Sequence, residues 1–153
     1  MMRENLKLLR TFSITNLTLS IVAAILLIVS LTMLSVGVAT ENRAAIVSGS
    51  IATTVIIAFS VLASIAAIVL VILGTIKAHN LSKMSQKYSV IFILWLILAI
   101  SQVFNIMFVW IPIVGFVIGS MLSIYIIFVY IYTIIKTSRS LKEYIDFKEV
   151  EQN

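Results

Sequence analysis

The chain has 153 residues, of which 61% are hydrophobic and 11% are charged, and its mean hydropathy is +1.18. This composition excludes an ordinary water-soluble domain. The absence of cysteine excludes disulfides and thiolate-bound metals. A helix needs about 20 residues to cross a hydrocarbon layer about 30 Å thick, so the length admits four crossings with short connections.

Charged residues divide the chain into three long uncharged runs, at 11–40, 44–76 and 88–135. The third run is too long for one helix and contains the only proline, Pro112. Because proline suits a helix start, we expect a turn between two spans there. The runs are continuously apolar rather than alternating, which disfavours a β-barrel. The sequence therefore predicts an all-α, polytopic integral membrane protein, a four-transmembrane-helix bundle. Its single domain covers 1–153, with helices at about 13–38, 46–76, 88–109 and 113–135.

Lysine and arginine are unevenly placed along the chain. Ten of the eleven basic residues fall in the N-terminal segment, in the loop 77–87 or in the C-terminal tail, and Arg43 is the exception. Short cytoplasmic segments are enriched in these residues, so we expect both termini in the cytoplasm. The net charge of +5 then forms a cytoplasmic rim rather than a nucleic-acid surface. The expected location is a plasma membrane, of bacterial type.

The first two uncharged runs are longer than a membrane crossing requires. A helix of about 30 residues extends about 45 Å, beyond the hydrocarbon core. Either these helices tilt or their ends leave the membrane on the outer side. Residues 36–50 could form a protruding helical hairpin or a loop, and the sequence leaves both open. A cleaved signal peptide is disfavoured because the first run far exceeds the usual 7–15 apolar residues.

The N-terminal end, residues 1–12, has an amphipathic pattern. Its three cations share one helical face: Arg3, Lys7 and Arg10. Leu6 and Leu9 lie away from that face. This arrangement predicts a short cytoplasmic helix on the membrane surface, before the chain turns inward, with its cations in contact with anionic lipids.

The C-terminal tail, residues 136–153, is also amphipathic. Arg139 with Glu143, and Lys142 with Asp146, are spaced to form ion pairs that would continue the last helix. The tail could dock a cytoplasmic partner, lie along the membrane or form a frayed end.

No Asp, Glu, Lys, Arg or His lies inside the four expected spans. Such residues are the usual mark of proton relays and ion pathways in membranes. Their absence argues against proton-coupled transport, and no residue pair is present for acid–base catalysis. The only histidine, His79, lies in the expected loop. We therefore expect no enzyme activity, no cofactor and no metal site.

Uncharged polar residues in the spans form one candidate site. Gln102 and Asn105 lie three residues apart on the third expected helix, at a depth near polar residues of the first two. Amides in hydrocarbon need partners, so both should face the bundle interior. The candidate polar pocket contains Gln102, Asn105, Thr53, Thr54 and Ser30. These groups either form interhelical hydrogen bonds or bind a ligand or ion.

Small residues recur along the fourth expected helix. Gly115, Gly119 and Ser123 form a stripe that permits close approach of another helix. The stripe packs either within the bundle, against small residues of the second helix, or against another membrane protein.

Two functions fit these observations. The first is a non-enzymatic membrane protein that acts through a partner, as an accessory, assembly or immunity-type subunit, by helix–helix contacts in the bilayer. The alternative is a small uncoupled transporter or channel with its polar site at Gln102 and Asn105. The expected partners are the bilayer, anionic lipids and a membrane protein or a second copy of the chain, but no nucleic acid.

Overall fold

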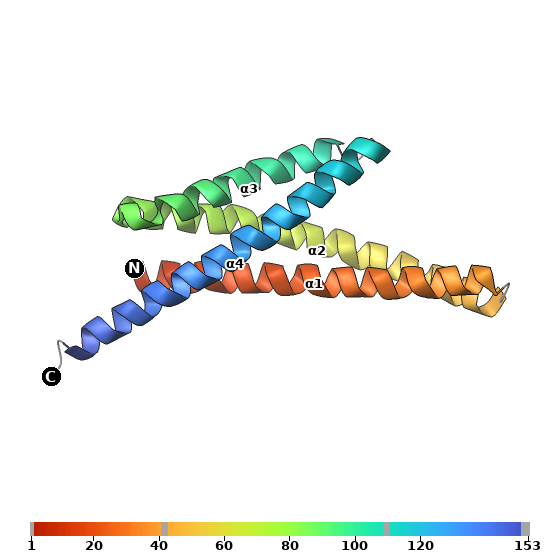
Figure 1. Cartoon of the computed structure of the whole chain (residues 1–153), viewed down its shortest axis with the longest axis horizontal. Coiled ribbons are helices and arrows are strands. Elements are labelled where there is room, and N and C mark those ends of the chain that lie inside the picture. The colour runs from red at the N-terminus through yellow and green to blue at the C-terminus, as the bar shows by residue number, and fades with distance from the viewer. Residues whose placement is uncertain (1, 41–42, 109–110, 151–153) are drawn as a thin grey trace. The chain divides into compact units, whose positions relative to one another are not determined.

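The structure, a computed structural model, describes residues 2–40, 43–108 and 111–150 (Figure 1). Four α-helices and one short 3-10 helix make up this part of the chain, and no β-strand occurs in it. The elements are α1 (Met2–Ala39), α2 (Arg43–Met84), η1 (Gln86–Tyr88), α3 (Ser89–Phe108) and α4 (Pro112–Val150). All four α-helices are long and apolar enough to cross a membrane. The prediction of an all-α chain with four such helices is confirmed.

Three of the helices extend well beyond the expected spans. α1 has 38 residues and α2 has 42, which correspond to lengths of about 57 and 63 Å, whereas α3 has 20. Most of the expected loop 77–87 is helical, since α2 ends only at Met84. Ser85 has extended backbone and its side chain accepts a hydrogen bond from Lys87 N at 3.4 Å, which starts η1. Hydropathy indicates which part of a helix can lie in lipid. The helix itself continues until a residue with non-helical backbone, such as Ser85, ends it.

The chain ends do not form separate helices in the described residues. α1 runs unbroken from Met2 and α4 continues to Val150, so the expected short helix over 1–12 is the first part of α1. Leu6 and Leu9, which lie away from the cationic face, are buried. They hold the start of α1 in a hydrophobic cluster with residues of the other three helices.

The chain divides into two compact units. The core unit consists of 1–17 and 68–153, and the hairpin unit consists of 18–67. α1 and α2 therefore each contribute residues to both units. The expectation of a single transmembrane domain stays a prediction.

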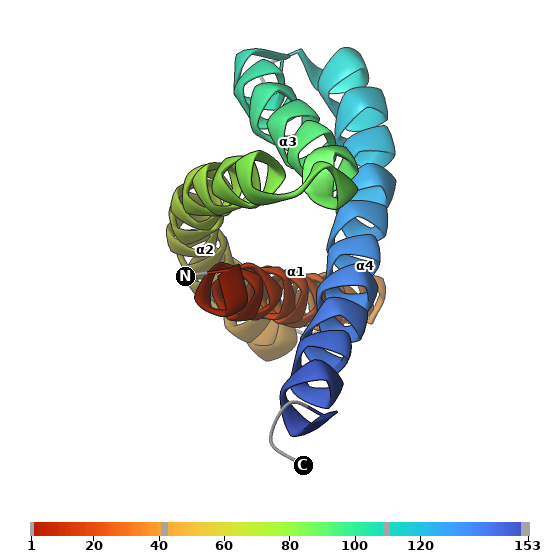
Figure 2. The ribbon, with the colours of Figure 1, turned by 90° about the vertical axis from the view of Figure 1, so that its left-hand side faces the viewer.

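The core unit has one hydrophobic cluster, to which all four helices contribute. On α3 its members Ile91, Trp95 and Leu98 follow helical spacing, so one stripe of the helix is buried. α3 lies beside the first half of α4, as Figures 1 and 2 both show. The remaining members are Leu6, Leu9, Val71, Ala78, Leu81, Tyr88, Val129, Tyr130 and Leu141.

The hairpin unit contains the part of the chain that the sequence left open. α1 continues to Ala39 and α2 begins at Arg43, so the described part of 36–50 forms two helices and not a loop. Residues 41–42 lie outside the described part. Three small residues of the described part of this unit, Ser30, Gly37 and Gly49, are buried. Further along, a small hollow is lined from both helices, mostly by small residues: Leu19, Ser20, Ala23, Ala63, Ser64 and Ala67.

Intervals of seven residues recur among the buried positions of this unit. Ala23, Ser30 and Gly37 follow one another at that interval on α1, and all three are buried or half-buried. On α2, Gly49, Ile56 and Ala63 have the same spacing and are also buried or half-buried. An interval of seven keeps residues on nearly the same face of a helix, so each helix turns one face inward.

Candidate functional site

The residues of the expected polar pocket are divided between the two units. Gln102 and Asn105 belong to α3 in the core unit, and both are half-buried. Ser30, Thr53 and Thr54 belong to the hairpin unit. The pocket stays a prediction, and each half of it is described separately.

The hydroxyls of the hairpin half are bonded within the helix that carries them. Thr53 Oγ1 donates to the carbonyl oxygen of Gly49 at 2.8 Å, and Thr54 Oγ1 donates to that of Ser50 at 3.0 Å. Each hydroxyl has a single proton to donate. These two side chains therefore retain only acceptor capacity for a ligand or for another helix.

The amides of the core half lie near the small-residue stripe of α4. A Cβ atom built on Gly119 would lie 4.0 Å from Asn105 Oδ1, which is an ordinary van der Waals distance. Ser123 is exposed and its hydroxyl donates to the carbonyl oxygen of Gly119 at 2.8 Å. The surroundings of Gly115 lie outside the described part of the structure. The stripe thus places Gly119 beside α3, although Ser123 faces outward.

The centre of the core unit is a tryptophan that the sequence analysis did not select. Trp95 of α3 is fully buried, and its Nε1–H donates to Thr133 Oγ1 of α4 at 3.0 Å. The Thr133 hydroxyl in turn donates to the carbonyl oxygen of Val129 at 2.7 Å. The Trp95 ring also packs against that of Tyr130, with 5.7 Å between centroids and 53° between planes. These contacts fix α3 against α4.

α2 meets the same tryptophan through a glycine. A Cβ atom on Gly74 would lie 1.9 Å from the six-membered ring of Trp95, so no side chain fits at this position. The neighbouring Thr75 hydroxyl lies 2.8 Å from the carbonyl oxygen of Val71 and 3.2 Å from that of Trp95. It shares its proton between the two oxygens, and one of them belongs to α3. Gly74, Thr75, Trp95 and Thr133 therefore join α2, α3 and α4.

Two signals in the sequence could have pointed to this cluster. Trp95 lies in the middle of an apolar run, away from the headgroup level where tryptophan is common, and its N–H needs a partner when buried. Gly74 lies in the interior of a long helix, where glycine is unfavourable without a packing reason. Neither signal identifies the partner helix.

The three N-terminal cations line one side of a groove between α1 and α4 in the core unit. The groove has a volume of about 390 Å³ and is lined by Arg3, Lys7, Arg10, Thr11, Ile14 and Leu141. Arg3, Lys7 and Arg10 are exposed, and their common face agrees with the expected pattern. None of the described lining residues is acidic.

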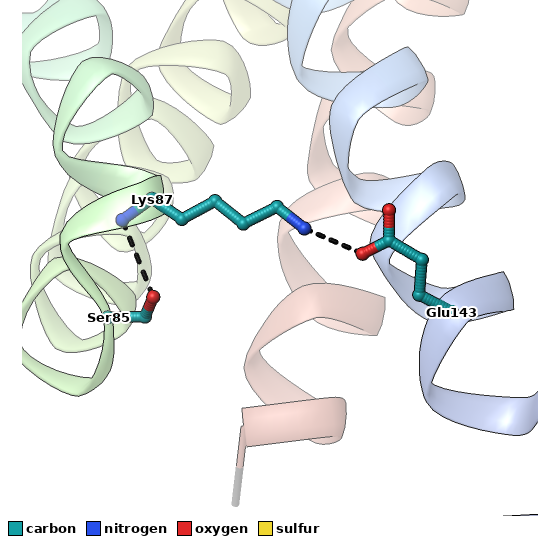
Figure 3. A network of polar contacts seen from close by, with 3 residues as sticks. All are labelled: Ser85, Lys87 and Glu143. Atoms are coloured by element: carbon teal, nitrogen blue, oxygen red, sulfur yellow. Dashed lines mark hydrogen bonds and ion pairs between the residues drawn. The ribbon is translucent and has the colours of Figure 1, made fainter. Parts of the chain in front are cut away.

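An ion pair links the turn after α2 to the last part of α4. Lys87 Nζ lies 2.6 Å from Glu143 Oε2, and Figure 3 shows the lysine reaching across to α4. Both side chains are exposed, by 44% and 63%. The helical spacing had suggested that Glu143 pairs with Arg139. In the structure Glu143 pairs with Lys87 instead. Lys87 can reach Glu143 because α4 passes close to η1.

The outer surface of the hairpin unit consists of large apolar side chains. Val38 and Val47 lie next to the turn and are 59% and 57% exposed. Along the rest of the two helices the pattern is the same, with Ile28, Met33, Val55 and Leu62 all more than half exposed. The hairpin thus exposes large apolar side chains along both of its helices.

Ionisable groups do not gather into a metal site in the described residues, where no three His, Asp or Glu side chains come together. His79, on α2, packs against Phe92 with 4.8 Å between ring centroids. Its Nδ1 atom is buried and has no hydrogen-bond partner in the structure.

The fold thus defines an all-α chain with four helices able to cross a membrane. Comparison with known protein families, curated proteins and solved structures finds no match.

Proposed function

We propose that this chain is a non-enzymatic, multi-pass membrane protein that acts by binding a partner protein through its hairpin unit. The observation that carries the proposal is the outward apolar surface of the hairpin, which continues to Val38 and Val47 beside the turn. An accessory, assembly or immunity-type subunit works in this way.

The membrane placement follows from the charges. With four crossings and ten of eleven basic residues on one side, both termini lie in the cytoplasm. The charged residues that flank the hairpin helices on that side are Arg10 and Lys77. A plasma membrane of bacterial type is the proposed location.

The length of the hairpin supports a tip that lies beyond the hydrocarbon in this placement. Even at a tilt of 40°, a helix crosses a layer of 30 Å in about 39 Å. The uncharged runs of α1 and α2 extend about 45 and 50 Å from their cytoplasmic ends. Val38 and Val47 therefore lie outside the hydrocarbon, where lipid tails do not cover them. Apolar patches exposed in this way mark interaction sites.

A pair of matched valines tests the proposal. Val47 and Val61 both lie on α2 and are 57% and 55% exposed, but only Val61 lies at hydrocarbon depth in the proposed placement. A photo-crosslinking residue at position 47 should give a discrete protein adduct in native membranes. The same residue at position 61 should give adducts with lipid. Lipid adducts alone at both positions would contradict the proposal.

The alternative of a small uncoupled transporter or channel has less support. The proposed pocket has five polar residues. The hydroxyls of two of them, Thr53 and Thr54, already donate hydrogen bonds to backbone carbonyls of their own helix. Gln102 and Asn105 remain as half-buried candidates. If the chain carries solute in liposomes, replacing both amides by leucine should abolish the flux, and unchanged flux would remove this site.

A further inference from the structure

The groove between α1 and α4 combines three features that together define a class of ligand. It contains three cations, one hydroxyl and two aliphatic side chains, and it lies at the start of the uncharged run that begins at Thr11. Its volume of about 390 Å³ lies within the range of small-molecule sites.

The two faces of α1 explain how the cations are held in place. Leu6, Leu9 and Ser13 are buried on one face at helical spacing, and Ser13 Oγ donates to the carbonyl oxygen of Leu9 at 2.9 Å. Because this face is fixed by the core, Arg3 and Lys7 must point away from it, into the groove. The cations are therefore presented by a packed helix and not by a mobile tail.

We propose that the groove binds an anionic phospholipid. The phosphate contacts Arg3, Lys7 and Arg10, since arginine and lysine are the usual partners of phosphate oxygens. The Thr11 hydroxyl donates to the same group, and an acyl chain lies against Ile14 and Leu141. The order of these residues along α1, with the cations first and the isoleucine last, matches the order of headgroup and acyl chain in a leaflet.

A neighbouring hollow provides a contrast. Lys7 also borders a space of about 550 Å³ with Glu4, Asn5, Leu8 and Lys77. A carboxylate lies among these lining residues, which lowers the attraction for an anion. The groove on the α4 side is thus the better anion site.

The proposal rests on the membrane placement given above but is independent of a protein partner. A failure to find protein crosslinks at position 47 would leave the proposed lipid site standing. A failure to find lipid binding would leave the proposed protein partner of the hairpin unit standing.

The test uses the full chain in a neutral detergent, titrated with phosphatidylglycerol and followed by native mass spectrometry. A variant with Arg3→Gln, Lys7→Gln and Arg10→Gln should bind about 100-fold more weakly, about fivefold for each cation. A matched control removes two arginines and a lysine elsewhere: Arg43→Gln, Lys83→Gln and Arg139→Gln. Its affinity should stay within about twofold of the original. Equal losses in both variants would overturn the proposal, because the effect would then be one of total charge.

A second pair of variants tests the groove without changing charge. Thr11→Val should weaken binding about tenfold, because a hydrogen bond to a charged phosphate is lost. Thr15→Val changes an exposed threonine that does not line the groove and should have no effect. Equal affinity of Thr11→Val and the original chain would contradict the proposal.

Two further ligands identify the source of the phosphate. Phosphatidylcholine, which has no net charge, and inorganic phosphate, which has no acyl chain, should each bind at least about tenfold more weakly than phosphatidylglycerol. Binding of inorganic phosphate as tight as that of the lipid would replace the lipid site by a site for free anions.

Discussion

The two units of the chain pack their helices in different ways. In the core unit, the interior is filled by large side chains around Trp95, and hydrogen bonds cross from helix to helix. In the described part of the hairpin unit, the buried residues are Ser30, Gly37 and Gly49, and the hydroxyls of Thr32 and Thr53 donate to carbonyls of their own helices. Large side chains fill the interior of one unit, whereas the buried positions described in the other carry small residues.

The hydrogen bonds between helices distinguish the core unit. Such a bond in a bilayer stabilises by about 0.6 kcal/mol on average, but its geometry also fixes rotation of the helices about their axes. The core unit has several of these bonds. Large apolar side chains are exposed on both units, among them Leu62 on the hairpin unit and Ile124 on the core unit. The units therefore differ in what fills their interiors and not in the kind of side chain on their outer surfaces.

The largest loss of stability is expected when a methyl group is added at Gly74 in the core unit. Gly74→Ala should lower the free energy of unfolding by about 3 kcal/mol, the upper part of the range for overpacking, because the ring of Trp95 occupies the space. Unfolding by a denaturing detergent, followed by circular dichroism, measures the change.

Gly119→Ala is the matched control, because it makes the same substitution in another helix interior. Its new Cβ atom meets only Asn105 Oδ1, at 4.0 Å, so its stability should change by less than about 1 kcal/mol. Similar losses in the two variants would show that Gly74 has no special contact with Trp95.

The interior of the hairpin unit should be sensitive to the size of the side chain at position 30. Ser30→Leu introduces a large side chain at a residue that is 1% exposed and should cost about 2 kcal/mol by overpacking. Since the chain has no cysteine, spin labels at Val38→Cys and Val47→Cys would report the separation of the two helices. The distance between the labels should increase and its distribution should broaden.

The control for this variant is Ser35→Leu, which changes an exposed serine of the same helix. The distance distribution should be that of the original chain. A broad distribution in both variants would indicate that the hairpin responds to any added bulk.

The smallest effect is expected at the ion pair between Lys87 and Glu143, both of which belong to the core unit. Lys87→Gln and Glu143→Gln should each leave the melting temperature unchanged within error, because exposed pairs contribute little. The double variant should behave in the same way at low and at high salt. A clear loss in the single variants would show that this contact helps to hold α4 in place.

Much of the fold could be predicted because hydropathy and charge act over long stretches. The uncharged runs indicated four helices, and Pro112 marked the start of the last one. Helix ends were less predictable, since lysine, arginine and glutamate favour helices as well as water. The extension of α2 to Met84 and of α4 to Val150 follows from that dual preference.

The side-chain contacts were harder to predict than the helices. A continuously apolar helix gives no sign of which face meets a neighbour, so the pairing of Gly74 with Trp95 could not be read from hydropathy. The cationic face of α1 was predictable because charge and apolar residues alternate there at helical spacing. The interval of seven between Ala23, Ser30 and Gly37 was also present in the sequence, but as a pattern of small residues rather than of large ones.

The division of the chain also sets an order for its assembly during synthesis. Residues 18–67 are continuous, so the hairpin unit has all its parts as soon as that segment leaves the ribosome. Leu6 and Leu9, by contrast, pack in a cluster that includes Val129 and Leu141. Their site in the core unit is therefore complete only after more than 100 further residues have been made. The hairpin unit can thus form before the core unit, although α1 begins in the core unit.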